Sequence, residues 1–291
     1  MAGICSKALV VVVAVLALVA GASAASPSSS AMNLRAADVP GAKVISQGAV
    51  KEKGYLASYV RNFVFSPPSA SSGLVTLDAE TRLASSSSVA AADVSLAGNV
   101  LRSSTRRKGF IATVAKEAGV KPSSVAVGAL RKVAGYDHGL ELPVTITVKG
   151  RQLYKNHIYL QLDRVFVFMV EFGSRPIKAA VTGKYATAIA GHIETELSPA
   201  LVSPPTVTGT VKKGRTLSAA PGTWKAANVT FTYQWQRCDG MGANCADVAG
   251  ATRRTYAVTR PDVGWSLRVV VTAANRFGSP AARSVATRVV L

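Results

Sequence analysis

The sequence has 291 residues, of which 48% are hydrophobic and 17% charged, and its 34 Lys and Arg against 15 Asp and Glu give a formal net charge of +19. So many apolar residues exclude a wholly disordered basic tail, and the length predicts two folded units because an average domain has ~150 residues. Three cysteines are too few for a disulfide-framework protein, and no stretch after the N-terminus approaches the ~18 consecutive apolar residues of a membrane span.

The N-terminus has the pattern of a secretory signal peptide. Lys7 precedes an unbroken apolar run from Ala8 to Ala20, and Ala22-Ser23-Ala24 is a small-residue cleavage site. A retained anchor is the less favoured alternative, because this run is too short to cross a ~30 Å hydrocarbon core. We therefore interpret residues 1–24 as a signal peptide cleaved after Ala24 and expect a secreted, extracellular protein.

Two composition breaks predict the domain boundaries. Residues 25–32 are rich in Ser, Ala and Pro and predict a flexible leader, because they can bury little apolar surface. The prolines Pro199, Pro204 and Pro205 predict an extended linker at residues 199–204. An α+β domain is thus expected at residues 33–198 and a second domain at residues 205–291.

The first domain is expected to contain one antiparallel sheet. Strand patterns occur at residues 43–50, 57–65, 74–83, 125–132, 142–149, 153–161 and 165–171. The segments between the later strands are short and polar, which predicts hairpins between consecutive strands.

Three helices are expected in the same domain. The first covers residues 88–101, and the second is opened by Thr105 and closed by Gly119. Ser174 is predicted to cap the third, with Pro176 in its first turn and an apolar face that reaches Ile193. This last helix should lie on the sheet.

The order of strands, central helices, strand meander and closing helix, with Asp38-Val-Pro-Gly41 before the first strand, resembles the PsbP/Mog1-type fold of actinobacterial exported proteins such as the LpqN family. The resemblance implies an antiparallel sheet with helices packed on it. The family has no agreed catalytic residues, so the resemblance implies no site.

No catalytic, cofactor-binding or metal site is predicted. His138, His157 and His192 do not have metal-ligand spacing, and His192 falls on an apolar helix face, where a core role is expected. The chain lacks a Gly-x-Ser-x-Gly elbow, a His-Glu-x-x-His motif, a phosphate loop and a dinucleotide fingerprint. A hydrolase that uses an Asp137-His138 base with a distant serine is the remaining enzyme hypothesis.

The densest basic cluster is formed by Arg102, Arg106, Arg107 and Lys108. The first interpretation is a solvated helix start; the alternative, an anion-binding site, gains some weight because positive charge at a helix N-terminus opposes the helix dipole. The expected partners are anionic cell-wall polymers, acidic polysaccharides, extracellular DNA or lipid headgroups. No aromatic residue interleaves the cluster, which argues against a dedicated nucleic-acid surface.

The second domain is expected to be all β. Phe231, Tyr233 and Trp235 alternate with polar residues, and residues 267–273 form a second alternating run. Short strands between Gly, Pro and Asn turns, without a helical period, predict two packed sheets.

An ordered set of motifs covers nearly all of this domain. They are Pro205-Thr-Val-Thr-Gly209, Gly214-x-x-Leu217, Gly222-Thr-Trp224, Tyr233-Gln-Trp235-Gln-Arg-Cys238, Cys245, Thr255-Tyr256, Asp262-Val-Gly264 and Asn275-x-x-Gly278. The set resembles the bacterial Ig-like modules of secreted and surface actinobacterial proteins. The resemblance implies an Ig-like β-sandwich, a fold that serves spacers, binders and adhesion units alike.

Cys238 and Cys245 flank a turn-rich loop, and we predict a disulfide between them because secretion supplies an oxidising compartment. A redox pair or a zinc site needs a C-x-x-C spacing or more ligands. Among the tryptophans, Trp224 and Trp235 are expected in packing roles, whereas Trp265 is the candidate for an exposed aromatic contact.

The leading hypothesis is a non-enzymatic protein of the bacterial envelope or exterior that binds through its Ig-like module and a basic surface. From residue 204 onward, 12 basic residues face only 3 acidic ones, so this smaller domain is the more densely basic. A lipid or small-molecule carrier with a pocket in the first domain is the alternative.

Overall fold

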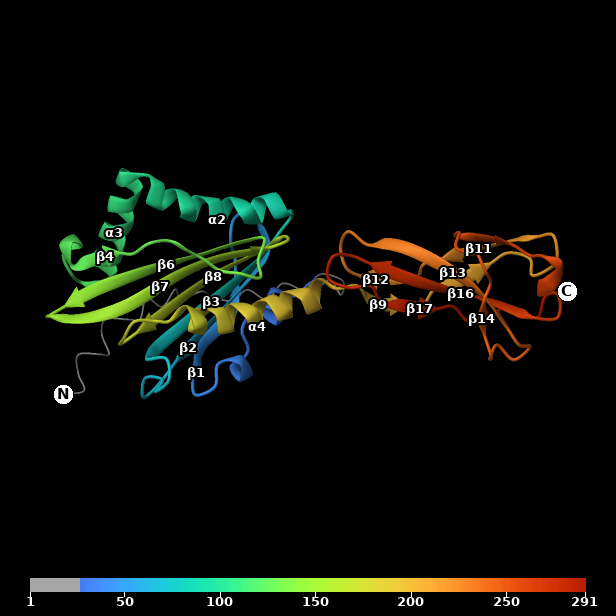
Figure 1. Cartoon of the computed structure of the whole chain (residues 1–291), viewed down its shortest axis with the longest axis horizontal. Coiled ribbons are helices and arrows are strands. Elements are labelled where there is room, and N and C mark those ends of the chain that lie inside the picture. Colours follow the sequence, from blue (N-terminus) through green and yellow to red (C-terminus); the bar gives the residue numbers. More distant parts are fainter. Residues whose placement is uncertain (1–26) are drawn as a thin grey trace. The chain divides into compact units, whose positions relative to one another are not determined.

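The computed structural model describes residues 27–291, which divide into two compact units, Ser28–Glu196 and Leu197–Leu291 (Figure 1). Both are built mainly from antiparallel strands, and the four α-helices of the described residues belong to the first unit, so residues 27–291 are of the α+β class. The predicted signal peptide and the first residues of the predicted leader lie outside the described residues.

One antiparallel sheet forms the centre of the first unit, as predicted. Its strands follow the order β1-β2-β3-β8-β7-β6-β4, and the short strand β5 also pairs with β6. The bounds are β1 Lys43–Val50, β2 Tyr55–Val64, β3 Leu74–Ala84, β4 Val125–Val127, β5 Arg131–Lys132, β6 His138–Val148, β7 Arg151–Leu162 and β8 Val165–Gly173. Most neighbours are consecutive in the chain, but β3 pairs with β8 across the central helices and the following meander.

The long helices cover both faces of this sheet. Helices α2 (Ser87–Arg102) and α3 (Ser104–Ala118) follow β3, and α4 (Ala179–Leu197) follows β8. Helix α2 packs on Phe166, whereas Thr182 of α4 bonds Glu171. These two β8 residues are an odd number of positions apart, and side chains alternate along a strand, so α2 and α4 lie on opposite faces.

Two predicted helix starts are corrected. Ser174 does not cap α4, because its backbone N–H and its hydroxyl both donate to the Gly73 carbonyl, and the helix begins at Ala179. Helix α3 begins at Ser104, where the Ser103 hydroxyl accepts from the Arg106 N–H. Gly119 ends that helix in the left-handed conformation, as predicted.

The flexible leader predicted for residues 25–32 is wrong for its described C-terminal part. Ser29–Met32 form the short helix α1, and the Met32 side chain is fully buried. The next residue, Asn33, is also fully buried and donates to the carbonyls of Tyr59 and Ala79, both at 2.9 Å. The composition misleads because one apolar anchor and sheet-directed hydrogen bonds suffice to fix a short segment.

The second unit contains short strands around one apolar core. They form the sheets β14-β13-β16-β17 and β10-β11-β15 and the pair β9-β12. The bounds are β9 Ala200–Ser203, β10 Thr206–Thr208, β11 Thr216–Ala220, β12 Thr223–Lys225, β13 Thr230–Cys238, β14 Ala246–Asp247, β15 Thr255–Ala257, β16 Ser266–Ala274 and β17 Ala281–Arg283. Trp235 is fully buried in the core, where it stacks on Tyr256 with ring centroids 5.4 Å apart.

The extended linker predicted for residues 199–204 is also wrong. Ala200–Ser203 form β9, which pairs with β12 through Leu201 opposite Trp224 and Ser203 opposite Thr223. Prolines on either side of this segment limit the strand to four residues, but they leave the intervening N–H groups free to bond. The second unit therefore begins before the prolines that were expected to delimit it.

Candidate functional site

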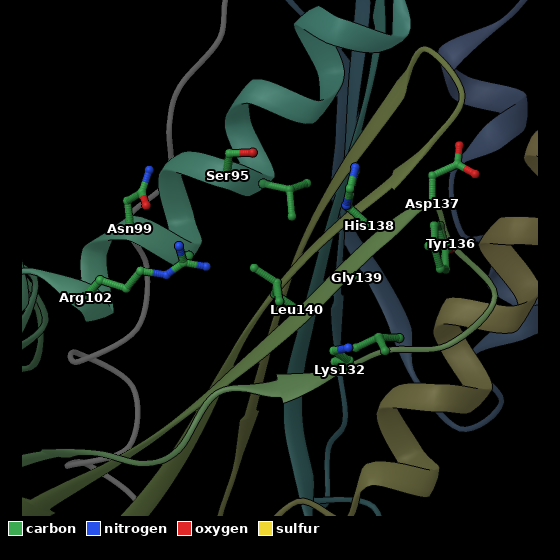
Figure 2. Close-up of a pocket in the computed structure, with 12 residues that line it drawn as sticks. Ser95, Asn99, Arg102, Lys132, Tyr136, Asp137, His138, Gly139 and Leu140 are labelled. Carbon is green, nitrogen blue, oxygen red and sulfur yellow. The ribbon is translucent and has the colours of Figure 1, made fainter.

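A groove opens in the first unit between α2 and the segment that joins β5 to β6. The cavity has a volume of about 530 Å³, and Figure 2 shows the residues around it. Helix α2 contributes Val94, Ser95, Gly98, Asn99 and Arg102, and the facing wall contributes Lys132, Val133 and Tyr136 to Leu140. We refer to it as the α2–β6 groove.

Two glycines set the shape of this groove. A Cβ atom on Gly98 would lie 3.4 Å from Leu140 Cδ1, so the helix approaches the strand closely at this point. A Cβ atom on Gly139 would lie 2.4 Å from the Val133 carbonyl oxygen, which a side chain cannot occupy. The Val133 N–H in turn donates to the Gly139 carbonyl at 3.0 Å, which closes the turn between β5 and β6.

Hydrogen bonds tie the groove to the rest of the unit. The Tyr136 hydroxyl donates to the Ala186 carbonyl of α4 at 2.7 Å, and burial raises the pKa of Tyr136, so the phenol stays neutral. At the other end, the Asp137 carboxylate accepts from the Asp163 N–H at 2.7 Å. The Asp163 carboxylate accepts from the Ser87 hydroxyl at 2.7 Å, which links the β7–β8 turn to the start of α2.

The charged side chains of the groove favour an anion. Arg102 and Lys132 lie on opposite walls and are both exposed, and Ser95 and Asn99 add neutral hydrogen-bond donors. Asp137 is the one acidic residue of the lining, and its carboxylate already accepts a backbone N–H. Guanidinium and ammonium groups that converge from two sides suit a sulfate, phosphate or carboxylate group.

The predicted basic cluster is divided between two helices. Arg102 is the last residue of α2 and lines the groove, whereas Arg106, Arg107 and Lys108 lie in the first turns of α3 and are exposed. Arg107 reaches across to β4, where its Nη2 donates to the Val127 carbonyl at 2.8 Å. The cluster therefore contributes one side chain to the groove and leaves exposed positive charge next to it in the chain.

The three histidines have separate surroundings. His138 lines the groove next to Asp137 in the sequence, and the Asp137 carboxylate accepts from the Asp163 N–H. His157 is buried between Phe110 and Phe168, where burial and Lys155 lower its pKa to about 3. His192 lies on α4 with Nδ1 3.0 Å from the Asn33 carbonyl oxygen, which fits the structural role expected for it.

The described part of the chain contains neither a cluster of metal-ligating side chains nor a helix suited to crossing a membrane. Residues 27–291 contain no group of three or more His, Cys, Asp or Glu side chains that could hold a metal ion. Over the same residues, no helix has the length and apolar composition that a bilayer crossing requires.

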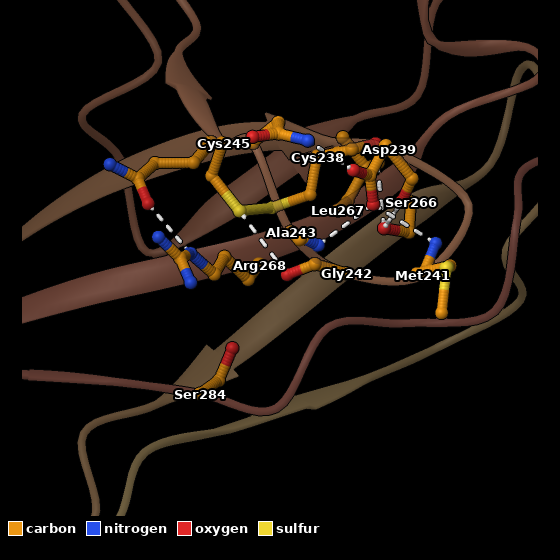
Figure 3. The surroundings of a disulfide bond; sticks show 12 residues. Cys238, Asp239, Met241, Gly242, Ala243, Cys245, Ser266, Leu267, Arg268 and Ser284 are labelled. Atoms are coloured by element: carbon orange, nitrogen blue, oxygen red, sulfur yellow. Dashed lines mark hydrogen bonds between the residues drawn. A yellow bond between two sulfur atoms is a disulfide. The ribbon is translucent and has the colours of Figure 1, made fainter.

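The predicted disulfide between Cys238 and Cys245 is present in the second unit (Figure 3). It closes a loop in which the Asp239 carboxylate accepts from the backbone N–H groups of Met241 and Ala243 at 3.0 and 2.8 Å. The same carboxylate accepts from the Asn244 side chain, and these bonds lower its pKa. The loop therefore has an internal anchor in addition to the covalent one.

All three acidic side chains of the second unit have partners within it. Asp239 holds its own loop, Asp247 accepts from Gln236 at 2.7 Å, and the fully buried Asp262 pairs with Arg237. Of the other basic residues, Arg268 on β16 and Arg283 on β17 are close enough that Arg283 contributes to lowering the pKa of Arg268, after the larger effect of burial. The surface of this unit is thus predominantly cationic.

The burial of Trp235 and the exposure of Trp265 agree with the predictions for these two residues. Trp235 is buried and Trp265 is 44% exposed. Trp224 is partly buried, and its Nε1 donates to the Pro221 carbonyl at 2.9 Å. Val263 is also exposed beside Trp265 in the sequence, so this end of the unit presents two apolar side chains.

No role was predicted from the sequence for four residues that line the groove, namely Ser95, Asn99, Lys132 and Tyr136. Lys132 ended a predicted strand, and Asn99 lay within a predicted helix, without any motif to connect them. The available signal was the pair Gly135 and Gly139 around Tyr136, which marks a tight turn at a strand start.

Comparisons with known proteins do not assign a family. No family model matches the sequence, and no curated protein matches it significantly. Among solved structures, the extracellular domain of PknH from Mycobacterium tuberculosis is similar over 57% of this chain and 93% of that chain, with 8% identity and a TM-score of 0.35. A likeness at this level carries no argument about activity or ligands.

Proposed function

We propose that this protein is exported to the bacterial envelope or exterior and binds an anionic polymer there, without catalysing a reaction. The observation that carries the proposal is the α2–β6 groove, in which Arg102 and Lys132 face each other across a cavity of about 530 Å³. One acidic group of a polymer would lie between these two cations, with Asn99 and Ser95 as neutral donors.

The second unit supports the same proposal through its surface charge. Its three side-chain carboxylates are engaged within the unit, and they stand against 12 basic side chains, which leaves the unit with a formal net charge of +9. A polymer with regularly spaced negative charges would interact with such a surface at many points, which increases its apparent affinity.

We further propose that the second unit is an Ig-like β-sandwich that serves as a binding or adhesion module. The support comes from the full-length pairing of β13 with β16, the buried Trp235 and the separate three-stranded sheet that shares its core. The signal-peptide pattern and the disulfide favour an oxidising compartment outside the cytoplasm.

Co-sedimentation of the full chain with purified cell walls tests the function. We expect binding at low salt that is lost at about 1 M salt, because exposed charges are screened over a few ångströms at that ionic strength. Binding that is absent at low salt, or that persists unchanged at high salt, contradicts the proposal.

A pair of charge variants tests the groove itself. Arg102→Ser with Lys132→Ser should weaken binding at least tenfold, because it removes both cations of the groove. The matched control is Lys51→Ser with Lys53→Ser, which removes the same charge from exposed residues at the β1–β2 turn. Equal losses in the two variants would show that net charge alone is responsible and would reject the groove as the site.

A further inference from the structure

Two buried carboxylates lie under α4, on the face of the sheet opposite to α2. Glu141 on β6 is 2% exposed and Glu171 on β8 is fully buried. Asn156 on the intervening strand β7 bridges them, with Nδ2 2.7 Å from Glu141 Oε1 and 3.3 Å from Glu171 Oε2. Neither carboxylate lines the α2–β6 groove, and the proposed function leaves them without a role.

Glu171 is poorly supported as an anion. Its Oε2 accepts from the Thr182 hydroxyl of α4 at 2.7 Å, but its Oε1 is buried and has no hydrogen-bond partner within the described residues. A buried charge with an unpaired oxygen is costly, whereas a protonated carboxyl avoids that cost. Burial raises the pKa of Glu171 to about 7, and the nearby Glu141 raises it as well, although Thr182 and Asn156 act in the opposite direction.

The other groups that face this pair come from three elements. On β5, Arg131 places Nη1 3.4 Å from Glu141 Oε1 and partly offsets the rise in the pKa of Glu141 that burial causes. On α4, Tyr185 is close enough for Glu171 to raise the pKa of its phenol, after the larger effect of burial. On β7, Asn156 is neutral. Arg131 is thus paired with Glu141, whereas the hydrogen bonds described for Glu171 come from the neutral Thr182 and Asn156, which favours retention of one proton by the pair.

The pair is joined to the groove by short covalent and hydrogen-bonded connections. Arg131 precedes Lys132, and Glu141 follows Leu140, so each partner of the ion pair adjoins a groove residue. Tyr136 of the groove donates to the Ala186 carbonyl, one turn of α4 after Thr182. A change in how α4 and β5 contact the carboxylates thus reaches both the cationic and the aromatic side of the groove wall.

We propose that Glu141 and Glu171 form a proton-binding site and that its protonation strengthens anion binding in the α2–β6 groove. This inference rests on the proposed function. Ionisation of Glu171 adds a second negative charge behind the groove wall, beside Glu141. By linkage, a bound anion must increase the proton affinity of the pair by the same factor.

The test measures binding of the full chain to dextran sulfate, whose sulfate esters stay ionised across the range used. His138→Gln is present in every sample, because His138 lines the groove and the measurement is designed to isolate the two buried carboxylates. We expect binding to be at least about fivefold tighter at about pH 5.5 than at about pH 8. Glu171→Gln, which mimics the protonated carboxyl, should bind tightly at both pH values.

Glu117→Gln is the matched control, because it removes the same charge from an exposed residue of α3 that pairs with Lys155. This control should keep the full pH dependence. Binding that is independent of pH in the parent, or pH dependence that survives Glu171→Gln, overturns the proton site while leaving the groove intact. If every groove variant instead bound as tightly as the parent, the proposed function would be rejected.

Nuclear magnetic resonance keeps the inference testable if Glu171→Gln does not fold. The side-chain carboxyl carbon of Glu171, labelled with ¹³C in the full chain, reports its titration directly. Dextran sulfate should move the midpoint of this titration to higher pH by about 0.7 units, which corresponds to the fivefold change in affinity. An unchanged midpoint at saturating dextran sulfate would exclude the linkage.

Discussion

The Asp262 carboxylate receives two hydrogen bonds from the Arg237 guanidinium, with Nη2 and Nε lying 2.6 and 3.0 Å from Oδ1. Oδ2 accepts from the Thr259 N–H and hydroxyl and from the Tyr256 hydroxyl at 2.7 to 2.8 Å. Asp262 is fully buried, so this ion pair connects β13, β15 and the turn before β16 inside the second unit.

Asp262→Asn should destabilise the second unit by about 2–3 kcal/mol, because it removes the charge that compensates Arg237 and replaces acceptors with donors. All three tryptophans lie in this unit, so tryptophan fluorescence of the full chain during urea unfolding follows it selectively. Asp247→Asn is the control, since that exposed carboxylate accepts only from Gln236 among the described contacts, and it should change stability by less than about 0.5 kcal/mol. Similar effects of the two substitutions would contradict the assigned importance of the buried pair.

Acid should weaken the second unit through the same residue. Burial alone would raise the pKa of Asp262, but the bonds from Thr259, Arg237 and Tyr256 outweigh it and lower the pKa. Because the folded pKa lies below the unfolded value of about 3.9, this stabilisation is complete above that pH and is lost as the pH falls through the folded pKa. Fluorescence-detected stability should therefore fall below about pH 4 in the parent and fall less in Asp262→Asn.

The opposite pH dependence is expected of Glu171 in the first unit. The folded pKa of Glu171, about 7, lies above the ordinary value of 4.5. Its contribution to the free energy of unfolding of the first unit is therefore fully present below about pH 4.5 and is lost as the pH rises through about 7. In Glu171→Gln, the free energy of unfolding of the first unit should decrease by about 3 kcal/mol less over this pH range than it does in the parent. Hydrogen–deuterium exchange of β8 and α4, corrected for intrinsic rates, measures this pH dependence of stability. Equal pH profiles of the parent and the variant would refute the role of Glu171.

His157 should contribute acid sensitivity to the same unit. Burial lowers its pKa to about 3, and its buried Nε2 has no hydrogen-bond partner among the residues that the structure describes. The folded state thus prefers the neutral ring, and stability is lost as the pH falls below the unfolded pKa of about 6.5. His157→Phe places a third phenyl ring between Phe110 and Phe168. On going from about pH 8 to about pH 5, the free energy of unfolding of this variant should rise by about 2 kcal/mol relative to that of the parent. Hydrogen–deuterium exchange of β7 peptides measures the difference. A constant difference across that range would exclude this origin.

Gly139→Ala tests the turn that shapes the α2–β6 groove. The new methyl group would lie 2.4 Å from the Val133 carbonyl oxygen, so the β5–β6 wall must shift. We expect at least a tenfold loss of dextran sulfate binding with little change in tryptophan-detected stability of the second unit. Gly109→Ala is the control, because nothing lies within 4 Å of a Cβ atom at that α3 position. Normal binding by Gly139→Ala would contradict the described groove geometry.

The regular parts of the fold were predictable because their signals are local. The β-forming and apolar residues of β7 and β8 and the helical spacing in α4 are each read within one segment of about twenty residues or fewer. The pairing of β3 with β8 was not predictable, since no local pattern specifies a partner about ninety residues away. The groove was not predicted for the same reason, because Arg102 and Lys132 come to line one cavity only through the tertiary fold.

The placement of β9 fixes where the second unit can be cut from the chain. A fragment that begins at Pro205, at the predicted domain start, lacks the strand that pairs with β12. It also lacks the Leu197 carbonyl that accepts from Asn275 at 2.7 Å. Such a fragment would expose an unpaired strand edge at Thr223–Lys225 and would be prone to self-association. A fragment that begins at Leu197 keeps β9, which pairs with this edge.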